Sequence, residues 1–359
     1  MNAGTELRVG LVGYGLAGAV FHAPLIEATD GLALTTVVTA DPERRARAQR
    51  EHPRASIVDS AEAMLAQSPD LVVIASPNRT HIPLARAALK AGCSVVVDKP
   101  LAATAAEGEE LVDLAARSGL LLSVFQNRRW DSDFLTLRRL IEDGELGEVL
   151  RFESRFERWR PRPKGDWRES SDPAEAGGLL YDLGSHLVDQ ALTLFGPVVR
   201  VYAETDVRRP ETGADDDSFI ALHHANGVRS HLWMSAVASR LGPRLRVLGT
   251  KAGFVKYGLD PQEEALRRGE RPATAPKGSW GTEPEVLWGT LGVGDQAKTI
   301  PSIPGDYPAY YAGIAAALRE GTPPPVDPAD SVAALRVLEA ARLSALEGRT
   351  VTLEERAAS

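Results

Sequence analysis

The first third of the chain alternates short apolar runs with longer segments rich in alanine, arginine and glutamate. This alternation is typical of parallel strands joined by crossover helices. Several runs are apolar at every position, as expected of strands that helices cover on both faces. We therefore predict a doubly wound α/β domain over residues 1–125, with six strands: Leu7–Val12, Leu32–Val38, Ser56–Val58, Leu71–Ala75, Ser94–Val97 and Leu120–Phe125.

The pattern changes after Asn127, where strand-like runs recur at longer spacing and with helices between them. Asn226-Gly227 between two of these runs is a hairpin signal. Residues 126–359 are therefore predicted to form an α+β domain with a mainly antiparallel sheet. Its predicted strands are Glu148–Phe156, Val198–Glu204, Ser218–His223 and Val228–Ser235, and its predicted helices are Asp133–Glu142, 179–194 and Asp330–Leu346.

Length and charge agree with a two-domain globular protein. The chain has 359 residues, and its 41 Lys and Arg against 49 Asp and Glu give a net charge of −8. An acidic balance argues against nucleic acid as the main partner. Cys93 is the single cysteine, so the chain forms no internal disulfide and has no thiolate cluster for zinc. We therefore expect a reducing compartment, the cytoplasm.

One uncharged stretch approaches the length of a membrane span. Val9–Ile26 contains no Asp, Glu, Lys or Arg. Four glycines, His22 and Pro24 interrupt it, however, and the preceding Met1–Arg8 has no basic cluster of the kind that opens a signal peptide. We predict neither export nor membrane anchoring.

A Gly-x-Gly-x-x-Gly motif directly follows the first predicted strand and precedes a predicted helix. Glycines there permit a tight turn and close approach of a ligand, and the amides of the helix start attract a pyrophosphate. A glycine-rich turn of another α/β protein is the alternative, because the motif alone is weak. Strand, turn and helix agree, so we favour a dinucleotide site formed by Gly13, Tyr14, Gly15, Leu16, Ala17 and Gly18.

Two further positions carry groups suited to acid–base chemistry. Lys99 follows the fifth predicted strand, at the sheet edge where open α/β sheets bind ligands, although a single lysine more often forms a surface salt bridge. Asp182 and His186 lie four residues apart and so on one face of the predicted helix 179–194. A solvated ion pair is the more common role of such a pair. The preceding Gly177-Gly178, however, lets another molecule approach the helix start.

These motifs together resemble the glucose-fructose oxidoreductase and inositol dehydrogenase family (Gfo/Idh/MocA) over essentially the whole chain. The resemblance rests on Gly13–Gly18, Ser76-Pro77-Asn78 through His81, Asp98-Lys99-Pro100 and the Asp182/His186 pair. Three longer strings, residues 14–22, 122–130 and 181–186, are similar to NADP-dependent scyllo-inositol dehydrogenases and are more specific than the glycine motif. Asp98 departs from the family, which usually has glutamate before Lys-Pro, but it keeps the charge.

The resemblance implies a Rossmann domain joined to an α+β domain whose open sheet forms a homodimer or homotetramer interface. It carries the family's catalytic lysine, aspartate and histidine onto Lys99, Asp182 and His186. It also implies cofactor contacts from Ser76, Pro77, Asn78, His81, Asp98 and Lys99, and substrate contacts from Phe21, Asn127, Arg128, Asp182 and His186.

The chemistry of these three side chains is compatible with oxidation of a secondary alcohol. Such a reaction needs a base for the hydroxyl proton, and a histidine with a pKa near 6.5 is suited to that work. His186 is therefore our predicted base. Asp182 would orient the imidazole or hydrogen bond the reacting hydroxyl, and the Lys99 ammonium would stabilise charge that develops on oxygen.

The end of the second strand bears on the choice of cofactor, and its signals conflict. An acid there accepts hydrogen bonds from the adenosine ribose and repels a 2′-phosphate, whereas arginines favour the phosphate. If Ala40 occupies the recognition position, Arg44 or Arg45 can reach the phosphate. If Asp41 occupies it, NAD is preferred, and here the sequence departs from its NADP-dependent relatives, which tend to carry arginine. We favour NADP, with NAD as the alternative.

Arg158–Arg168 interleaves aromatic and basic residues, which in a basic protein would suggest single-stranded nucleic acid. The acidic total argues against that reading. We predict a loop over the active site, with Trp167 and Arg168 as substrate contacts, and a plain surface loop is the alternative.

No metal site is predicted. Asp215–Asp217 could suggest a cation, but three adjacent carboxylates cannot converge without a turn, so we expect a solvated loop. His223 and His224 adjoin on a strand and face opposite sides.

The sequence thus predicts an NAD(P)-dependent dehydrogenase that interconverts a secondary alcohol and a ketone on a cyclic polyol or sugar, with an inositol as the favoured substrate. A glycoside hydrolase of the same family, which oxidises its substrate transiently without net use of cofactor, is the first rival. A non-catalytic cofactor-binding protein ranks last, since it would be expected to lack the lysine, aspartate or histidine.

Overall fold

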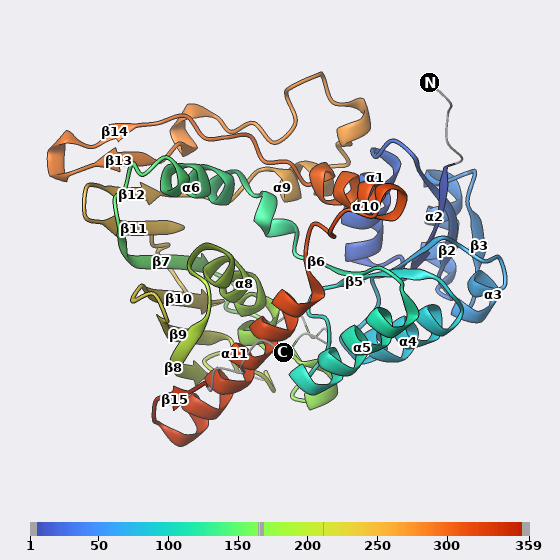
Figure 1. Cartoon of the computed structure of the whole chain (residues 1–359), viewed down its shortest axis with the longest axis horizontal. Helices are drawn as coiled ribbons and strands as arrows, with labels where there is room; N and C mark the ends of the chain where they lie inside the picture. Colours follow the sequence, from blue (N-terminus) through green and yellow to red (C-terminus); the bar gives the residue numbers. More distant parts are fainter. Residues whose placement is uncertain (1–5, 164, 166–168, 211, 354–359) are drawn as a thin grey trace.

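Two β-sheets, each covered by helices, make up the computed structural model, which describes residues 6–163, 165, 169–210 and 212–353 (Figure 1). The smaller sheet and its helices form one half of the molecule, and the larger sheet forms the other half. The doubly wound domain followed by an α+β domain is thereby confirmed.

The N-terminal sheet has six parallel strands in the order β3-β2-β1-β4-β5-β6. Chain order reverses between β1 and β4, so the carboxyl ends of these neighbouring strands open the crevice in which such sheets bind ligands. All six predicted strands are present, with shifts of at most two residues at their ends: β1 (Leu7–Val12), β2 (Leu32–Val38), β3 (Ser56–Val58), β4 (Leu71–Ile74), β5 (Ser94–Asp98) and β6 (Leu122–Phe125).

Side-chain caps begin three of the helices that cover this sheet. Asp41, Ser60 and Thr104 each accept a hydrogen bond from a backbone amide three residues later, which satisfies one of the free amides at a helix start. The four helices between β2 and β6 are α2 (Pro42–Glu51), α3 (Ala61–Leu65), α4 (His81–Lys90) and α5 (Ala105–Ser118).

The helix predicted after the glycine turn has an unusual first part. Ala17–His22 forms one turn and a half of π-helix, and only then does the chain continue as α1 (Ala23–Glu27). Such wide turns occur mostly at functional sites. Gly13, with φ of 95°, sets the turn itself, because a side chain there would meet the carbonyl of Ala75 at 2.6 Å.

The C-terminal sheet has nine strands in the order β14-β13-β12-β11-β7-β10-β9-β8-β15. Its pairs are antiparallel except β7 with β10, which confirms the predicted class. The predicted strands correspond to β7 (Val149–Glu157), β8 (Val198–Asp206), β9 (Asp217–His224) and β10 (Arg229–Ser235). Sequence reasoning missed β11 (Leu245–Gly249), β12 (Gly253–Lys256), β13 (Thr290–Gly292), β14 (Lys298–Thr299) and β15 (Val351–Thr352).

The helix predicted over 179–194 is two helices. Asp182 ends the short α7 (Leu179–Asp182), and His186 lies in the first turn of α8 (Gly184–Phe195) after a break at Leu183. The spacing had suggested that the Asp182 and His186 side chains share one helix face. They lie instead on two different helices. The other helices of this domain are α6 (Ser132–Glu142), α9 (Gln262–Arg267), α10 (Pro308–Glu320) and α11 (Pro328–Glu347).

The last two long helices join the domains. The helix α11 packs against α8 and β8 of its own domain and against α5 of the first domain, and α10 packs against α1 (Figure 1). Tyr311 of α10 places its hydroxyl 2.6 Å from Nδ1 of the buried His22. No helix in the described part of the chain is long and apolar enough to cross a membrane.

The acidic run Asp215–Asp217 is not the solvated loop that we expected. Asp216 is fully buried and pairs with Arg209 at 2.9 Å, and Asp215 accepts hydrogen bonds from the Leu180 amide and the Ser218 hydroxyl. Ser218 and Arg209 are near in the sequence, but the Leu180 amide is 35 positions from Asp215, and only the fold brings these partners together. His223 and His224 do face opposite sides of β9, and the described residues contain no group of side chains able to hold a metal.

Candidate active site

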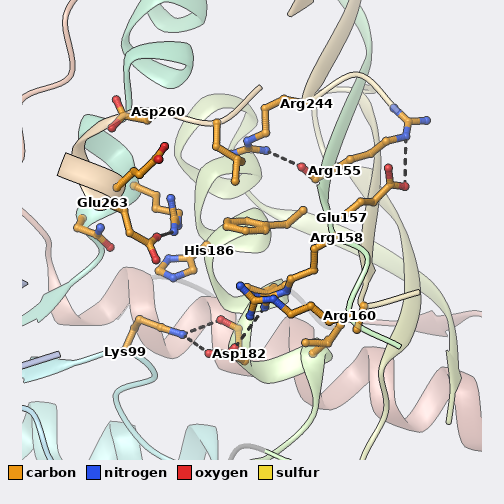
Figure 2. Close-up of a pocket in the computed structure, with 18 of the residues that line it drawn as sticks. Lys99, Arg155, Glu157, Arg158, Arg160, Asp182, His186, Arg244, Asp260 and Glu263 are labelled. Atoms are coloured by element: carbon orange, nitrogen blue, oxygen red, sulfur yellow. Dashed lines mark hydrogen bonds and ion pairs between the residues drawn. The ribbon is translucent and has the colours of Figure 1, made fainter. Parts of the chain in front are cut away.

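A cavity of about 840 Å³ opens between the two domains, beside the carboxyl ends of the parallel strands (Figure 2). The N-terminal domain contributes the glycine turn and the residues after β5 and β6. The C-terminal domain contributes the end of β7, the helices α7 and α8, and the segment around α9. The predicted site residues that line it are Leu16, Ala17, Phe21, Asp98, Lys99, Asn127, Arg128, Asp182 and His186.

Lys99 and Asp182 meet in this cavity, although 83 positions separate them in the sequence. The Lys99 ammonium donates to the Asp182 carboxylate at 2.8 Å and to the Asp182 carbonyl oxygen at 2.6 Å. Lys99 directly follows β5, and the carboxylate of Asp98, the last residue of that strand, accepts a hydrogen bond from the Lys99 amide at 2.9 Å. Through this hydrogen bond to the backbone, the aspartate at position 98 holds the turn that carries Lys99.

His186 lies in the same cavity and is only 5% exposed. Its Nδ1 has no hydrogen-bond partner among the described residues. Burial, together with the nearby charges of Lys99, Arg128 and Arg244, holds the pKa of His186 well below its ordinary value. The imidazole is therefore neutral at physiological pH and able to accept a proton.

The start of α7 explains the Gly-Gly sequence before it. Gly178 has φ of 91°, and a side chain there would collide with the Asp215 carboxylate, which lies 2.7 Å from the Leu180 amide and caps the helix. A side chain of the protein itself therefore approaches this helix start, and Gly178 also lines the cavity, so the approach of another molecule there stays a prediction.

The glycine turn has the form of a ligand cradle. Gly18 is required by packing, since a side chain would meet the Gly13 carbonyl at 2.0 Å. Gly15 is different, because a side chain there would meet nothing of the protein closer than the Arg44 guanidinium at 3.7 Å. The backbone of Gly15 therefore faces open space, as the close approach of a pyrophosphate requires. The residues of this turn therefore fit a dinucleotide.

The turn after β4 lies next to this cradle. The buried His81 places Nδ1 2.8 Å from the Pro100 carbonyl and Nε2 2.9 Å from the Ser76 carbonyl, and so it joins this turn to the one that carries Lys99. Asn78 is also buried and donates to the Glu175 carbonyl at 2.8 Å. Ser76 hydrogen bonds Thr80 at 2.6 Å. Direct contacts of Ser76, Pro77, Asn78 and His81 with a cofactor remain predictions.

At the end of β2, the two arginines are held differently. Arg45 pairs with Asp59 and donates to the Ile57 carbonyl at 2.9 Å, which directs it toward β3. The Arg44 guanidinium lies beside Gly15 of the cradle. Asp41 accepts the Arg44 amide at 2.8 Å as the cap of α2, and Ala40 is exposed before it. Of the two arginines, Arg44 is therefore the one that lies beside the cradle.

Some of the predicted substrate contacts line the cavity, and two others fall outside the described residues. Arg128 is buried, with a guanidinium 2.6 Å from Glu263 and 3.3 Å from Asp131, and Phe21 and Asn127 line the cavity near it. Trp167 and Arg168 lie outside the described residues.

Sequence reasoning missed several side chains of the cavity. Arg244 and Glu263 come from segments whose structure was not predicted, and no local motif marks them. Arg158 and Arg160 stand at the start of the basic stretch that was assigned to the active site, but Trp167 and Arg168 had been singled out instead. Figure 2 shows Arg158 and Arg160 on the same side of the cavity as Asp182.

Comparison with known proteins agrees with this geometry. Residues 7–126 match the NAD-binding Rossmann fold of an oxidoreductase family, GFO_IDH_MocA, and residues 138–353 match the C-terminal α/β domain of the same family. The chain is 42% identical to the oxidoreductase YdgJ of Escherichia coli K12, over 97% of this chain and 99% of that protein.

It is also 37% identical to the scyllo-inositol 2-dehydrogenase (NADP⁺) IolW of Bacillus subtilis, over 97% of this chain and 96% of IolW. A solved structure of the oxidoreductase YvaA from Bacillus subtilis superposes with a TM-score of 0.91 at 37% identity, covering 98% of this chain and 99% of that one. Both domains are matched in the same order, over nearly the whole chain. The chain is a dehydrogenase-type member of the Gfo/Idh/MocA oxidoreductase family.

Proposed function

We propose that this protein interconverts a secondary alcohol and a ketone on a cyclic polyol or sugar, with an inositol as the first expected substrate. The observation that carries the proposal is the meeting of the Lys99–Asp182 pair and the buried, neutral His186 in one cavity beside the glycine cradle. The similarity to a scyllo-inositol dehydrogenase supports the choice of substrate.

A bound nicotinamide would supply the hydride acceptor or donor. In alcohol oxidation, His186 accepts the hydroxyl proton, which its lowered pKa allows at neutral pH. The Lys99 ammonium stabilises negative charge on the substrate oxygen. Asp182 holds that ammonium in place through its carboxylate and its carbonyl oxygen, so we assign it to positioning the lysine.

The pH dependence should follow His186. Because burial and nearby cations lower its pKa, the imidazole is neutral above pH 6.5 and becomes protonated only in more acidic solution. Alcohol oxidation should therefore be constant with pH above 6.5 and fall below it, whereas ketone reduction should rise as the imidazole gains a proton. The measurement is kcat against pH in both directions, with a deuterated substrate used to establish that hydride transfer limits the rate. An oxidation midpoint above pH 6.5 would contradict the assignment.

We further propose NADP as the preferred cofactor, with Arg44 as the residue that meets the 2′-phosphate. Arg44→Ala should lower kcat/KM for NADP by about 10-fold and leave that for NAD nearly unchanged, since one charge-assisted contact is lost. Arg45→Ala is the matched control, because Arg45 is held by Asp59 and Ile57. Equal losses in both variants, or no loss in Arg44→Ala, would show that Arg44 does not read the phosphate.

The substrate assignment is tested with a panel of inositols, inososes and aldoses, each assayed with NADP and NAD. We expect net reduction of cofactor with at least one inositol or sugar. A glycoside hydrolase would instead release its product without net use of cofactor, so the same assay separates the rival function.

The protein is expected to act in the cytoplasm and to associate through the open face of the nine-stranded sheet. That face carries half-exposed aromatic side chains on neighbouring strands, with Phe219 and Trp233 at 5.1 Å between ring centroids. Apolar rings on a sheet face favour burial against a second copy of the chain. A homodimer or homotetramer is our proposal for the assembly.

A further inference from the structure

The basic side chains that line the cavity are not all closely paired with carboxylates. Among the described residues, eight basic side chains line it, and six of these lie within 3.1 Å of a carboxylate. These six are Lys99, Arg128, Arg155, Arg209, Arg244 and Arg267. Such pairing is the ordinary condition of basic groups that are removed from water.

Arg158 and Arg160 are the exceptions. The carboxylate nearest to Arg158 is that of Asp182, at 3.9 Å, and its other oxygen is already held by Lys99 at 2.8 Å. Arg160 is exposed to solvent, lines the cavity and forms no ion pair with any carboxylate in the described part of the chain. Lys99, Arg158 and Arg160 are therefore three cationic groups on the same side of the cavity as Asp182. Of these, Arg158 and Arg160 have no carboxylate at hydrogen-bonding distance among the described residues.

The backbone fixes both arginines on the same side. The chain continues in an extended form beyond β7, where the Arg158 amide donates to the Ser235 carbonyl at 2.9 Å and the Arg160 amide to the Ala236 carbonyl at 2.7 Å. Trp159 between them bridges to Val237 and points the other way, since side chains alternate along an extended chain. Arg158 and Arg160 thus face the cavity together (Figure 2).

Arg158 is not an ordinary surface arginine. Its side chain is only 26% exposed and lies over the Phe156 ring, and burial together with the charge of Arg160 lowers the pKa of Arg158. A guanidinium in that position is partly desolvated without the full compensation of a carboxylate. An anion held between Arg158 and Arg160 would supply the missing negative charge.

We infer that Arg158 and Arg160 form a subsite for an oxyanion of the substrate, a carboxylate or a phosphate ester, next to the carbon that is oxidised. Guanidinium groups suit this task, because their planar donors pair with two oxygens at once. The inference rests on the proposed function and narrows it: the preferred substrate is an acidic polyol or sugar, and an uncharged inositol is a weaker one.

The test compares three polyhydroxylated six-membered rings: an uncharged inositol, an inositol monophosphate and a hexuronate in its pyranose form. Wild-type kcat/KM for one of the two anionic substrates should exceed that for the uncharged one by about 10- to 100-fold, the value of a charged hydrogen-bonded contact. The anion that shows the gain identifies the group, phosphate or carboxylate. Arg160→Gln should reduce that preference by at least about 10-fold.

Arg162→Gln is the matched control, since Arg162 is exposed, carries the same charge and does not line the cavity. It should retain the wild-type preference, and unchanged quenching of tryptophan fluorescence by NADP in both variants shows that the fold and the cofactor site are intact. Equal use of charged and uncharged substrates by the wild type would overturn the inference while the proposed function stands. An unchanged preference in Arg160→Gln would also overturn it. Failure of all three substrates with both cofactors would count against the proposed function itself.

Discussion

Replacing His186 with alanine should lower kcat for alcohol oxidation by about 10²- to 10⁴-fold, the usual contribution of a general base. The expectation follows from its position: the imidazole is buried in the cavity, its Nδ1 has no partner among the described residues, and its lowered pKa keeps it neutral. Cofactor binding should persist, because the glycine cradle lies on another domain. The measurement is kcat for the best substrate and, separately, the Kd of NADP.

His223→Ala is a matched control for this variant. His223 lies on β9, outside the cavity lining, and its removal should leave kcat unchanged. If His186→Ala instead retained kcat within about twofold of the wild type while chemistry limits the rate, another group must accept the proton.

Lys99→Met should lower kcat by about 10²- to 10³-fold, because it removes the positive charge that stabilises the substrate oxygen. Methionine keeps much of the volume of the lysine stem, so the variant tests the charge more than the packing. The substitution also removes the contact between Lys99 and the Asp182 carboxylate at 2.8 Å. Lys90→Met, at the exposed end of α4, should have no effect on kcat. A Lys99→Met enzyme whose only defect is a higher KM would show that the lysine binds substrate without assisting the reaction.

The sequence predicted the N-terminal domain well because each of its elements has a local cause. Strands such as β4 and β5 are apolar on both faces, and Thr104 and Asp41 mark helix starts. The strands β11 to β14 were missed because they are short and, except for β14, include a glycine, so neither length nor alternation distinguishes them from loops. Their pairing along the edge of a long sheet, rather than their own propensity, makes them strands.

The candidate site was predicted only in part. Some of its residues belong to local motifs, whereas others come from distant segments that only the fold brings together. Lys99, Asp182 and His186 were identified from motifs, and the structure brings them into one cavity. The break at Leu183 was not foreseen, because a run of apolar residues at helical spacing continues through it. Arg244 was not foreseen either, since its influence on the pKa of His186 depends on a contact between distant strands and helices.

The central claim is that the protein removes hydride from a secondary alcohol carbon and transfers it to a nicotinamide. It is tested most directly with a substrate that carries deuterium on that carbon, by measuring where the label goes during a single turnover. Our account predicts that the deuterium appears on the reduced cofactor in a one-to-one ratio with the ketone formed, and that His186→Ala slows its transfer. Release of product with the deuterium retained, or lost to solvent without net reduction of cofactor, would contradict the account.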